Sequence, residues 1–209
     1  RDIFARTSVL EQILTSGGGW QDQVGGITAG VKLNTTHADL SQSPDIRWLP
    51  DKVLQDDIVS GRALLYYTGI TRLARNILSE IVRGIFLNNR RTIATIEDIA
   101  YNADFTADAI QRNDATTLRE AIRRSWNLNC TLDSGTCPPP VQTIVDRIAP
   151  FNPSFKLLGA GGGGYMLILA PDVAAAAAIS ETLQMNPSNP QARFVSLEIS
   201  QTGMQITRS

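Results

Sequence analysis

The stretch that decides the fold reads Phe155-Lys156-Leu157-Leu158, then Gly159-Ala160-Gly161-Gly162-Gly163-Gly164, then Tyr165-Met166-Leu167-Ile168-Leu169. The apolar runs on either side of the glycines have the length and composition of buried strands. A glycine cluster weakens a helix or strand, because glycine costs conformational entropy and packs no side chain. The stretch therefore predicts two strands joined by a glycine turn.

Further elements are predicted on both sides of this hairpin. Apolar residues at helical spacing predict helices at 3–14, 71–87, 92–110, 115–128, 141–148 and 171–183. Alternating or compact apolar runs predict strands at 27–33, 46–49 and 63–67, and a closing hairpin of 193–199 with 204–207 around Gly203. This order predicts an α+β fold, with helices packed on one face of an antiparallel sheet.

Composition excludes several classes of protein. The chain has 209 residues, 19 Lys and Arg against 20 Asp and Glu, and a net charge of −1. It has no broad basic field, which excludes a nucleic-acid-coating role, and no apolar run approaches the ~20 residues that span a bilayer. Two cysteines, Cys130 and Cys137, and the single histidine His37 exclude a Cys/His zinc cluster. We expect a soluble, cytoplasmic protein with no nucleic-acid or membrane partner.

The glycine turn is the first candidate for chemistry. Glycines allow backbone N–H groups to crowd around an anion, which side chains would obstruct. No Gly-Lys-Ser/Thr sequence ends the run, so it is no Walker A loop. Two interpretations stay open at this point: a site for phosphate groups and a tight structural turn.

A second glycine-rich segment, Gly17-Gly18-Gly19-Trp20-Gln21-Asp22-Gln23-Val24-Gly25-Gly26, surrounds a single carboxylate. Asp22 could hold a substrate hydroxyl and accept its proton during transfer. The alternative is that Asp22 caps a helix or closes an Asx turn, as most loop aspartates do.

The third candidate is Tyr67-Thr68-Gly69-Ile70-Thr71-Arg72, where a predicted strand runs into a predicted helix. Helix N-termini attract anions through unpaired N–H groups. Arg72 in the first turn runs against the dipole preference, so it either serves an anion or is a solvated arginine.

Together the three segments resemble the GHMP small-molecule kinases. The turn 159–164 resembles the third signature motif of that superfamily, and Gly17-Gly18-Gly19-Trp20-Gln21-Asp22-Gln23 resembles its sugar-kinase branch. With Trp before Gln-Asp-Gln and Val-Gly-Gly after it, the sequence is most similar to the L-fucokinases, including the kinase half of bifunctional fucokinase/fucose-1-phosphate guanylyltransferases.

This resemblance implies an ATP-dependent kinase that phosphorylates the anomeric hydroxyl of L-fucose. It implies that Asp22 is the catalytic residue. It also implies an ATP- and phosphate-proximal set of Gly159, Ala160, Gly161, Gly162, Gly163 and Arg72, and a sugar-binding set of Gly18, Gly19, Trp20, Gln23 and Thr68. Phosphoryl transfer needs mainly positioning and charge neutralisation, which such groups supply.

The sequence also departs from the family pattern. Complete members begin with a Pro-x-Arg-x-Asp-like strand and carry a Gly/Ser-rich phosphate loop, and neither stands upstream of Asp22. We therefore expect residues 1–50 to be the end of the family's N-terminal domain and 51–209 to be its ferredoxin-like C-terminal domain. The Mg²⁺ that accompanies ATP would be held outside this chain, and the chain alone would be inactive.

Two alternatives remain beside L-fucose kinase activity. The sugar could differ, for instance a heptose phosphate or a galactose-like sugar. The chain could also be a non-catalytic module that keeps the C-terminal fold of the kinases.

Overall fold

The computed structural model describes residues 2–13, 21–37, 43–70, 74–159 and 161–205. Its α-helices are α1 (Asp2–Ile13), α2 (Gln21–Ile27), α3 (Lys52–Val59), α4 (Ala74–Phe86), α5 (Arg90–Gln111), α6 (Ala115–Leu132), α7 (Pro139–Ile148) and α8 (Val173–Met185). Its strands are β1 (Lys32–Thr35), β2 (Asp45–Trp48), β3 (Ala63–Tyr67), β4 (Ser154–Leu157), β5 (Tyr165–Leu169) and β6 (Arg193–Val195). Short 3₁₀ turns, η1 (Ser134–Thr136) and η2 (Ala149–Phe151), flank α7.

The central sheet has four strands in the order β4-β5-β3-β6, and every neighbouring pair is antiparallel. β4 and β5 form a hairpin, whereas β3 and β6 reach their neighbours through helical crossovers. This is the split β-α-β arrangement of ferredoxin-like folds. The predicted strand–turn–strand unit and the predicted α+β class are therefore confirmed.

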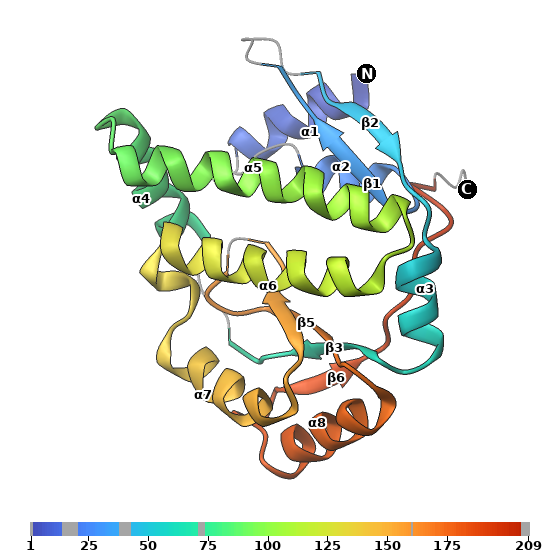
Figure 1. Cartoon of the computed structure of the whole chain (residues 1–209). Coiled ribbons are helices and arrows are strands. Elements are labelled where there is room, and N and C mark those ends of the chain that lie inside the picture. The colour runs from blue at the N-terminus through green and yellow to red at the C-terminus, as the bar shows by residue number, and fades with distance from the viewer. Residues whose placement is uncertain (1, 14–20, 38–42, 71–73, 160, 206–209) are drawn as a thin grey trace, which may run out of the picture.

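Helices cover both faces of this sheet, whereas the sequence led us to expect one covered face (Figure 1). Successive strand residues point to opposite faces, so Met166 and Ile168 of β5 pack in one core cluster while Leu169 packs in another. The first cluster holds residues of α7 and α8 together with Trp126 of α6, and the second holds residues of α3, α5 and α6. The crossover from β3 to β4 contains α4 to α7, and of these helices α7 packs in the first cluster whereas α5 packs in the second.

Local sequence signals set where the two longest helices begin and end. The side chain of Asn89 accepts hydrogen bonds from the N–H groups of Arg91 and Thr92 and so caps α5. Asn113 follows α5 with a positive φ of 56°, a conformation that asparagine tolerates. Asp114 then caps α6 in the same way as Asn89 caps α5.

The N-terminal region differs from the expectation in its details. Only the end of the predicted strand 27–33 is a strand, because α2 extends to Ile27 and β1 begins at Lys32. β1 pairs with β2 in a separate two-stranded sheet, with Lys32 opposite Trp48. The helix α2 contains two glycines, so its propensity is poor, and the burial of Gln23 and Val24 is what favours it.

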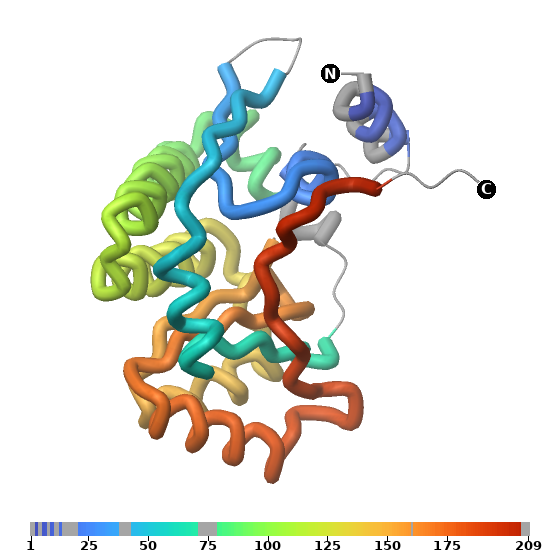
Figure 2. The backbone as a smooth tube through the Cα atoms, turned by 90° about the vertical axis from the view of Figure 1, so that its right-hand side faces the viewer, coloured from blue at the N-terminus to red at the C-terminus, as the bar shows by residue number. Residues whose placement is uncertain are grey.

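The predicted C-terminal hairpin is wrong for the described residues. Arg193–Val195 forms β6, which pairs with β3 and not with residues after Gly203. The segment beyond β6 runs up the side of the molecule to α2 (Figure 2). There the N–H of Met204 donates to the carbonyl of Ile27, and the N–H of Gly30 donates to that of Ser200.

At the expected boundary between 1–50 and 51–209 the structure has the helix α3. Its Asp57 is fully buried and pairs with Arg62 at 2.8 Å and with Arg119 of α6 at 2.7 Å. Leu49, just before the boundary, packs in the same core cluster as Val53 just after it. The two sides are thus in contact, and the division at residue 50 stays a prediction. No helix among the described residues is long and apolar enough to span a membrane.

Candidate active site

Asp22 lies in the first turn of α2 with an exposed side chain. A carboxylate is favoured there because the first N–H groups of a helix are unpaired. A surface cavity of about 350 Å³ opens beside it, lined by Ile3 and Thr7 of α1, by Asp22, Gln23, Gly26 and Ile27 of α2, and by Met204. The position is compatible with both interpretations of Asp22, a helix-stabilising residue and a base that faces a substrate.

Backbone contacts hold α2 in place. The hydroxyl of Thr28 donates to the carbonyl of Val24 at 2.7 Å, and the N–H of Met204 donates to that of Ile27 at 3.1 Å. A side chain on Gly203 would overlap the carbonyl oxygen of Ile27, so the C-terminal segment approaches α2 as closely as a backbone can. The carboxylate of Asp22 is therefore carried by a helix that is fixed at its far end.

The glycine turn connects β4 and β5 with an unusual backbone conformation, and backbone hydrogen bonds hold it against neighbouring segments. Its five described glycines all have positive φ, between 79° and 155°. The N–H of Gly162 donates to the carbonyl of Thr136 at 2.8 Å, and that of Gly164 donates to Ile70 at 2.9 Å. Two of the amides that could have met a phosphate are thus used inside the protein.

Packing accounts for two of these glycines. A Cβ on Gly161 would come within 2.8 Å of the Thr136 side chain, and one on Gly163 would overlap the carbonyl of Ile70. Gly159, in contrast, has open space where a side chain would stand, so only its φ of 79° favours glycine. The tight structural turn left open by the sequence therefore has direct support, and the phosphate role stays a prediction.

Thr68 belongs to the support of this turn. It is fully buried, and its hydroxyl donates to the carbonyl of Gly164 at 2.9 Å while accepting from the N–H of Ile70 at 3.3 Å. Its carbonyl accepts from the amide of Asn189 at 2.7 Å. These bonds give Thr68 a structural role, and its predicted contact with a sugar is not tested by them.

The predicted site residues fall into two groups. Gly159, Gly161–Gly163 and Thr68 lie together around the turn, whereas Asp22 and Gln23 line the cavity on α2, and no described residue of the turn lines that cavity. Gly18, Gly19, Trp20, Arg72 and Ala160 lie outside the described residues. Sequence reasoning missed Thr136 and named Ile70 only as part of the third candidate segment, since nothing in their local sequence signals contact with a loop distant in the chain.

No metal centre is found in the part of the chain that the structure describes. It contains no group of three or more His, Cys, Asp or Glu that could bind a metal ion. His37 is exposed and lies 3.6 Å from Asp45. Cys130 and Cys137 are free thiols. The pKa of Cys130 is raised to about 11, mainly by burial and to a smaller extent by the nearby Cys137.

Part of the chain matches a known protein family. Residues 106–186 match the family described as "GHMP kinases C terminal". The C-terminal GHMP kinase domain that the sequence predicted is therefore confirmed over these residues. It is 46% identical over 208 residues to the L-fucokinase/L-fucose-1-P guanylyltransferase of Bacteroides fragilis, and 29% identical over 176 residues to the bifunctional fucokinase/GDP-fucose pyrophosphorylase of Arabidopsis thaliana.

These alignments cover all of this chain and 22% of the first relative, and 84% of this chain and 17% of the second. The chain thus spans about a fifth of the length of the curated relatives that it matches.

Solved structures agree on the fold. A provisionally assigned sugar kinase from Campylobacter jejuni matches 94% of this chain and 53% of its own, with a TM-score of 0.65 at 18% identity. Mevalonate kinase from L. major matches 79% of this chain and 48% of its own, with a TM-score of 0.59 at 16% identity. At these identities the likeness concerns the fold alone.

Proposed function

We propose that the chain is part of an ATP-dependent sugar kinase that phosphorylates the anomeric hydroxyl of L-fucose, giving L-fucose 1-phosphate. The observation that carries the proposal is the 46% identity over 208 residues to a protein named as an L-fucokinase. The GHMP kinase C-terminal domain within residues 106–186 supports the same class of enzyme.

Asp22 is the residue on this chain that we propose to act on the sugar. A carboxylate that accepts or orients the proton of an attacking hydroxyl increases its nucleophilicity toward the γ-phosphate of ATP. The exposed side chain beside a cavity of about 350 Å³ supports this role, because a substrate could reach it. Gly18, Gly19, Trp20 and Gln23 would bound the sugar, and Arg72 would neutralise charge on the transferring phosphoryl group.

The glycine turn would act through its shape. With the amides of Gly162 and Gly164 engaged by Thr136 and Ile70, the turn is a preformed wall whose remaining backbone can lie close to ATP. Such a wall needs no rearrangement when the nucleotide binds, which favours transfer.

Asp22→Asn, made in the protein as encoded by its full reading frame, tests the proposal. We expect kcat for L-fucose, measured by coupled ADP release, to fall by about 100-fold or more while KM changes little, because the amide cannot accept the proton. The matched control is Asp104→Asn on α5, another exposed aspartate, and it should retain activity. Wild-type activity in Asp22→Asn would show that Asp22 is not the base.

The two alternatives have separate tests. A panel of L-fucose, D-galactose and heptose phosphates in the same assay identifies the sugar, and a preference for another sugar would contradict the L-fucose assignment. Calorimetry with ATP and L-fucose distinguishes a kinase from a non-catalytic module, since a module binds neither. We expect the 209-residue chain alone to show negligible turnover, and robust turnover by it would contradict our expectation that the Mg²⁺ is held outside this chain.

A further inference from the structure

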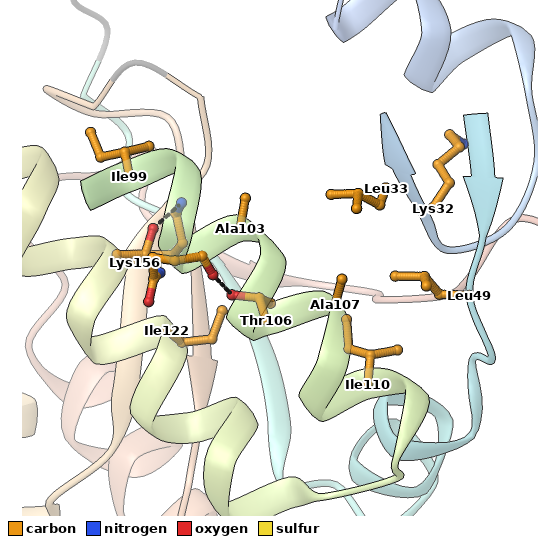
Figure 3. Close-up of a pocket in the computed structure, with 12 residues that line it drawn as sticks. Lys32, Leu33, Leu49, Ile99, Ala103, Thr106, Ala107, Ile110, Ile122 and Lys156 are labelled. Carbon is orange, nitrogen blue, oxygen red and sulfur yellow. Dashed lines mark hydrogen bonds between the residues drawn. The ribbon is translucent and has the colours of Figure 1, made fainter. Parts of the chain in front are cut away.

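A second cavity, of about 300 Å³, lies between the β1–β2 hairpin and the helices α5 and α6 (Figure 3). Most of its wall is apolar, with Leu33 and Leu49 on one side and Ile99, Ile110 and Ile122 on the other. Neither Asp22 nor any described residue of the glycine turn lines it. A cavity of this size and character suits a small ligand with an apolar body.

One partly buried cationic side chain lies in this wall. Lys156 of β4 points toward α6, where its Nζ donates to the hydroxyl of Ser125 at 2.8 Å. No Asp or Glu among the described residues lines the cavity or pairs with this lysine. Burial lowers the pKa of Lys156 from its ordinary value of 10.5. An ammonium with one hydroxyl partner keeps two more N–H groups for a ligand.

An acceptor without a donor lies in the same wall. Asn102 of α5 is 3% exposed, and its amide nitrogen donates to the carbonyl of Ala121 at 3.0 Å. Its Oδ1 is buried with no hydrogen-bond donor among the described residues. A buried polar atom left unpaired is costly, so a ligand that donates to it would relieve that cost.

The second lysine of the cavity contributes its stem and not its charge. The Nζ of Lys32 donates to the carbonyl of Thr28 at 2.6 Å and to that of Gly30 at 3.2 Å, beyond the end of α2. Figure 3 shows this nitrogen directed away from Lys156. The ionic character of the cavity therefore comes from one cation, which suits a monoanion. A phosphate dianion would need more donors than Lys156 and Ser125 provide.

We propose that this cavity binds a small hydroxycarboxylate with a branched apolar body. Its carboxylate pairs with the ammonium of Lys156, its hydroxyl donates to Oδ1 of Asn102, and its alkyl group packs among Leu33, Ile110 and Ile122. The site is built from β1, α5, α6 and β4, so ligand binding also stabilises the docking of the hairpin on the helices.

Three probes separate the contributions: 2-hydroxy-4-methylpentanoate, its des-hydroxy analogue 4-methylpentanoate, and the uncharged 2-hydroxy-4-methylpentanamide. Binding to the 209-residue chain is followed by NMR titration. We expect saturable binding of the hydroxycarboxylate with a Kd of about 1 mM or below. The amide should bind at least tenfold more weakly, because it lacks the charge, and the des-hydroxy acid about fivefold more weakly, because Oδ1 of Asn102 stays unpaired.

Lys156→Met keeps an unbranched side chain, one heavy atom shorter, and removes the charge. It should weaken binding of the hydroxycarboxylate at least tenfold and leave binding of the amide unchanged, while thermal unfolding verifies that the variant is folded. Lys52→Met, on the exposed face of α3, is the matched control and should bind as the wild type does. Absence of saturable binding, equal binding of acid and amide, or an equal loss in both lysine variants would each overturn the proposal.

Discussion

Gly163 shows most directly why the turn between β4 and β5 is made of glycine. Its φ of 155° disfavours side chains, and a Cβ would overlap the carbonyl of Ile70. We expect Gly163→Ala to lower the free energy of unfolding by about 2 kcal/mol or more, from backbone strain and the clash together. Gly159→Ala is the control, because it adds only the strain of a positive φ, about 1 kcal/mol. Urea unfolding measures both, and equal losses would refute the packing argument.

Lys156 gives a pH-dependent prediction at the same scale. Burial lowers its pKa in the folded state, so the unfolded chain binds more protons between that lowered value and 10.5. The unfavourable contribution of Lys156 to stability is therefore largest at neutral pH and is relieved as the pH rises through this window. Lys32 is the other ionisable side chain of the cavity, and no described carboxylate lines it.

The comparison with Lys156→Met isolates that contribution, because other groups titrate equally in both proteins. Relative to wild type, the variant should lose stability as the pH rises from 7 to 10. Urea unfolding at several pH values gives the difference in free energy. A difference that does not change with pH would mean that the lysine titrates as an exposed one.

At the scale of elements, the sequence predicted those parts of the fold whose signals are local. β3 and β5 were predicted with their observed bounds, because each strand is a compact run of apolar residues with buried positions on both faces of the sheet. The helices α5 and α6 were predicted from their periodicity, within a few residues of their caps. In the site, the glycine turn was found in the same way, since glycines that require positive φ are visible in the sequence.

The elements that sequence reasoning missed depend on contacts between distant residues. α2 contains Gly25 and Gly26, and tertiary burial of Val24 overrides that poor propensity. β6 was assigned to a local hairpin because no sequence signal shows that Phe194 pairs with Tyr66 instead. Lys156 and Asn102 were missed for the same reason, although a lysine inside an apolar strand is a signal that could have been followed.

Asp57 of α3 ties three elements together. Its buried carboxylate pairs with Arg62, just before β3, and with Arg119 of α6. Removing a carboxylate between two partly buried guanidinium groups leaves both without their partner. We expect Asp57→Ala to lower the free energy of unfolding by about 3–5 kcal/mol, measured by chemical denaturation.

The neighbouring Asp56 provides the control for this measurement. It is exposed and pairs with Lys52 at 2.6 Å within the same helix, a type of pair that contributes about 0.3–0.5 kcal/mol. Asp56→Ala should therefore change stability little. Similar losses in the two variants would show that the position in α3, and not the buried pair, decides the effect.

At the scale of the whole molecule, residues 1–50 differ in how closely they pack against the rest of the chain. Val9, Leu10 and Ile13 of α1 are each more than half exposed. In contrast, Leu33 and Leu49 belong to the core cluster of α3 and α5, and the C-terminal segment reaches α2 (Figure 2). The exposed apolar side chains of α1 support our proposal that residues 1–50 and 51–209 belong to different domains.

Two truncations test this proposal together with the boundary at residue 50. The chain 21–209 lacks α1, whose described apolar side chains are exposed, so its thermal midpoint should stay within about 3 °C of the full chain. The chain 51–209 keeps the four-stranded sheet and should still unfold cooperatively. It loses Leu49, which is buried, and Leu33, which is partly buried, from one cluster; burial of a leucine contributes up to about 1.5–3 kcal/mol, so its midpoint should fall by about 5–15 °C. Circular dichroism follows both transitions. Loss of cooperative unfolding in 51–209 would place the domain boundary before residue 50, and an equally low midpoint in 21–209 would mean that α1 contributes to the core.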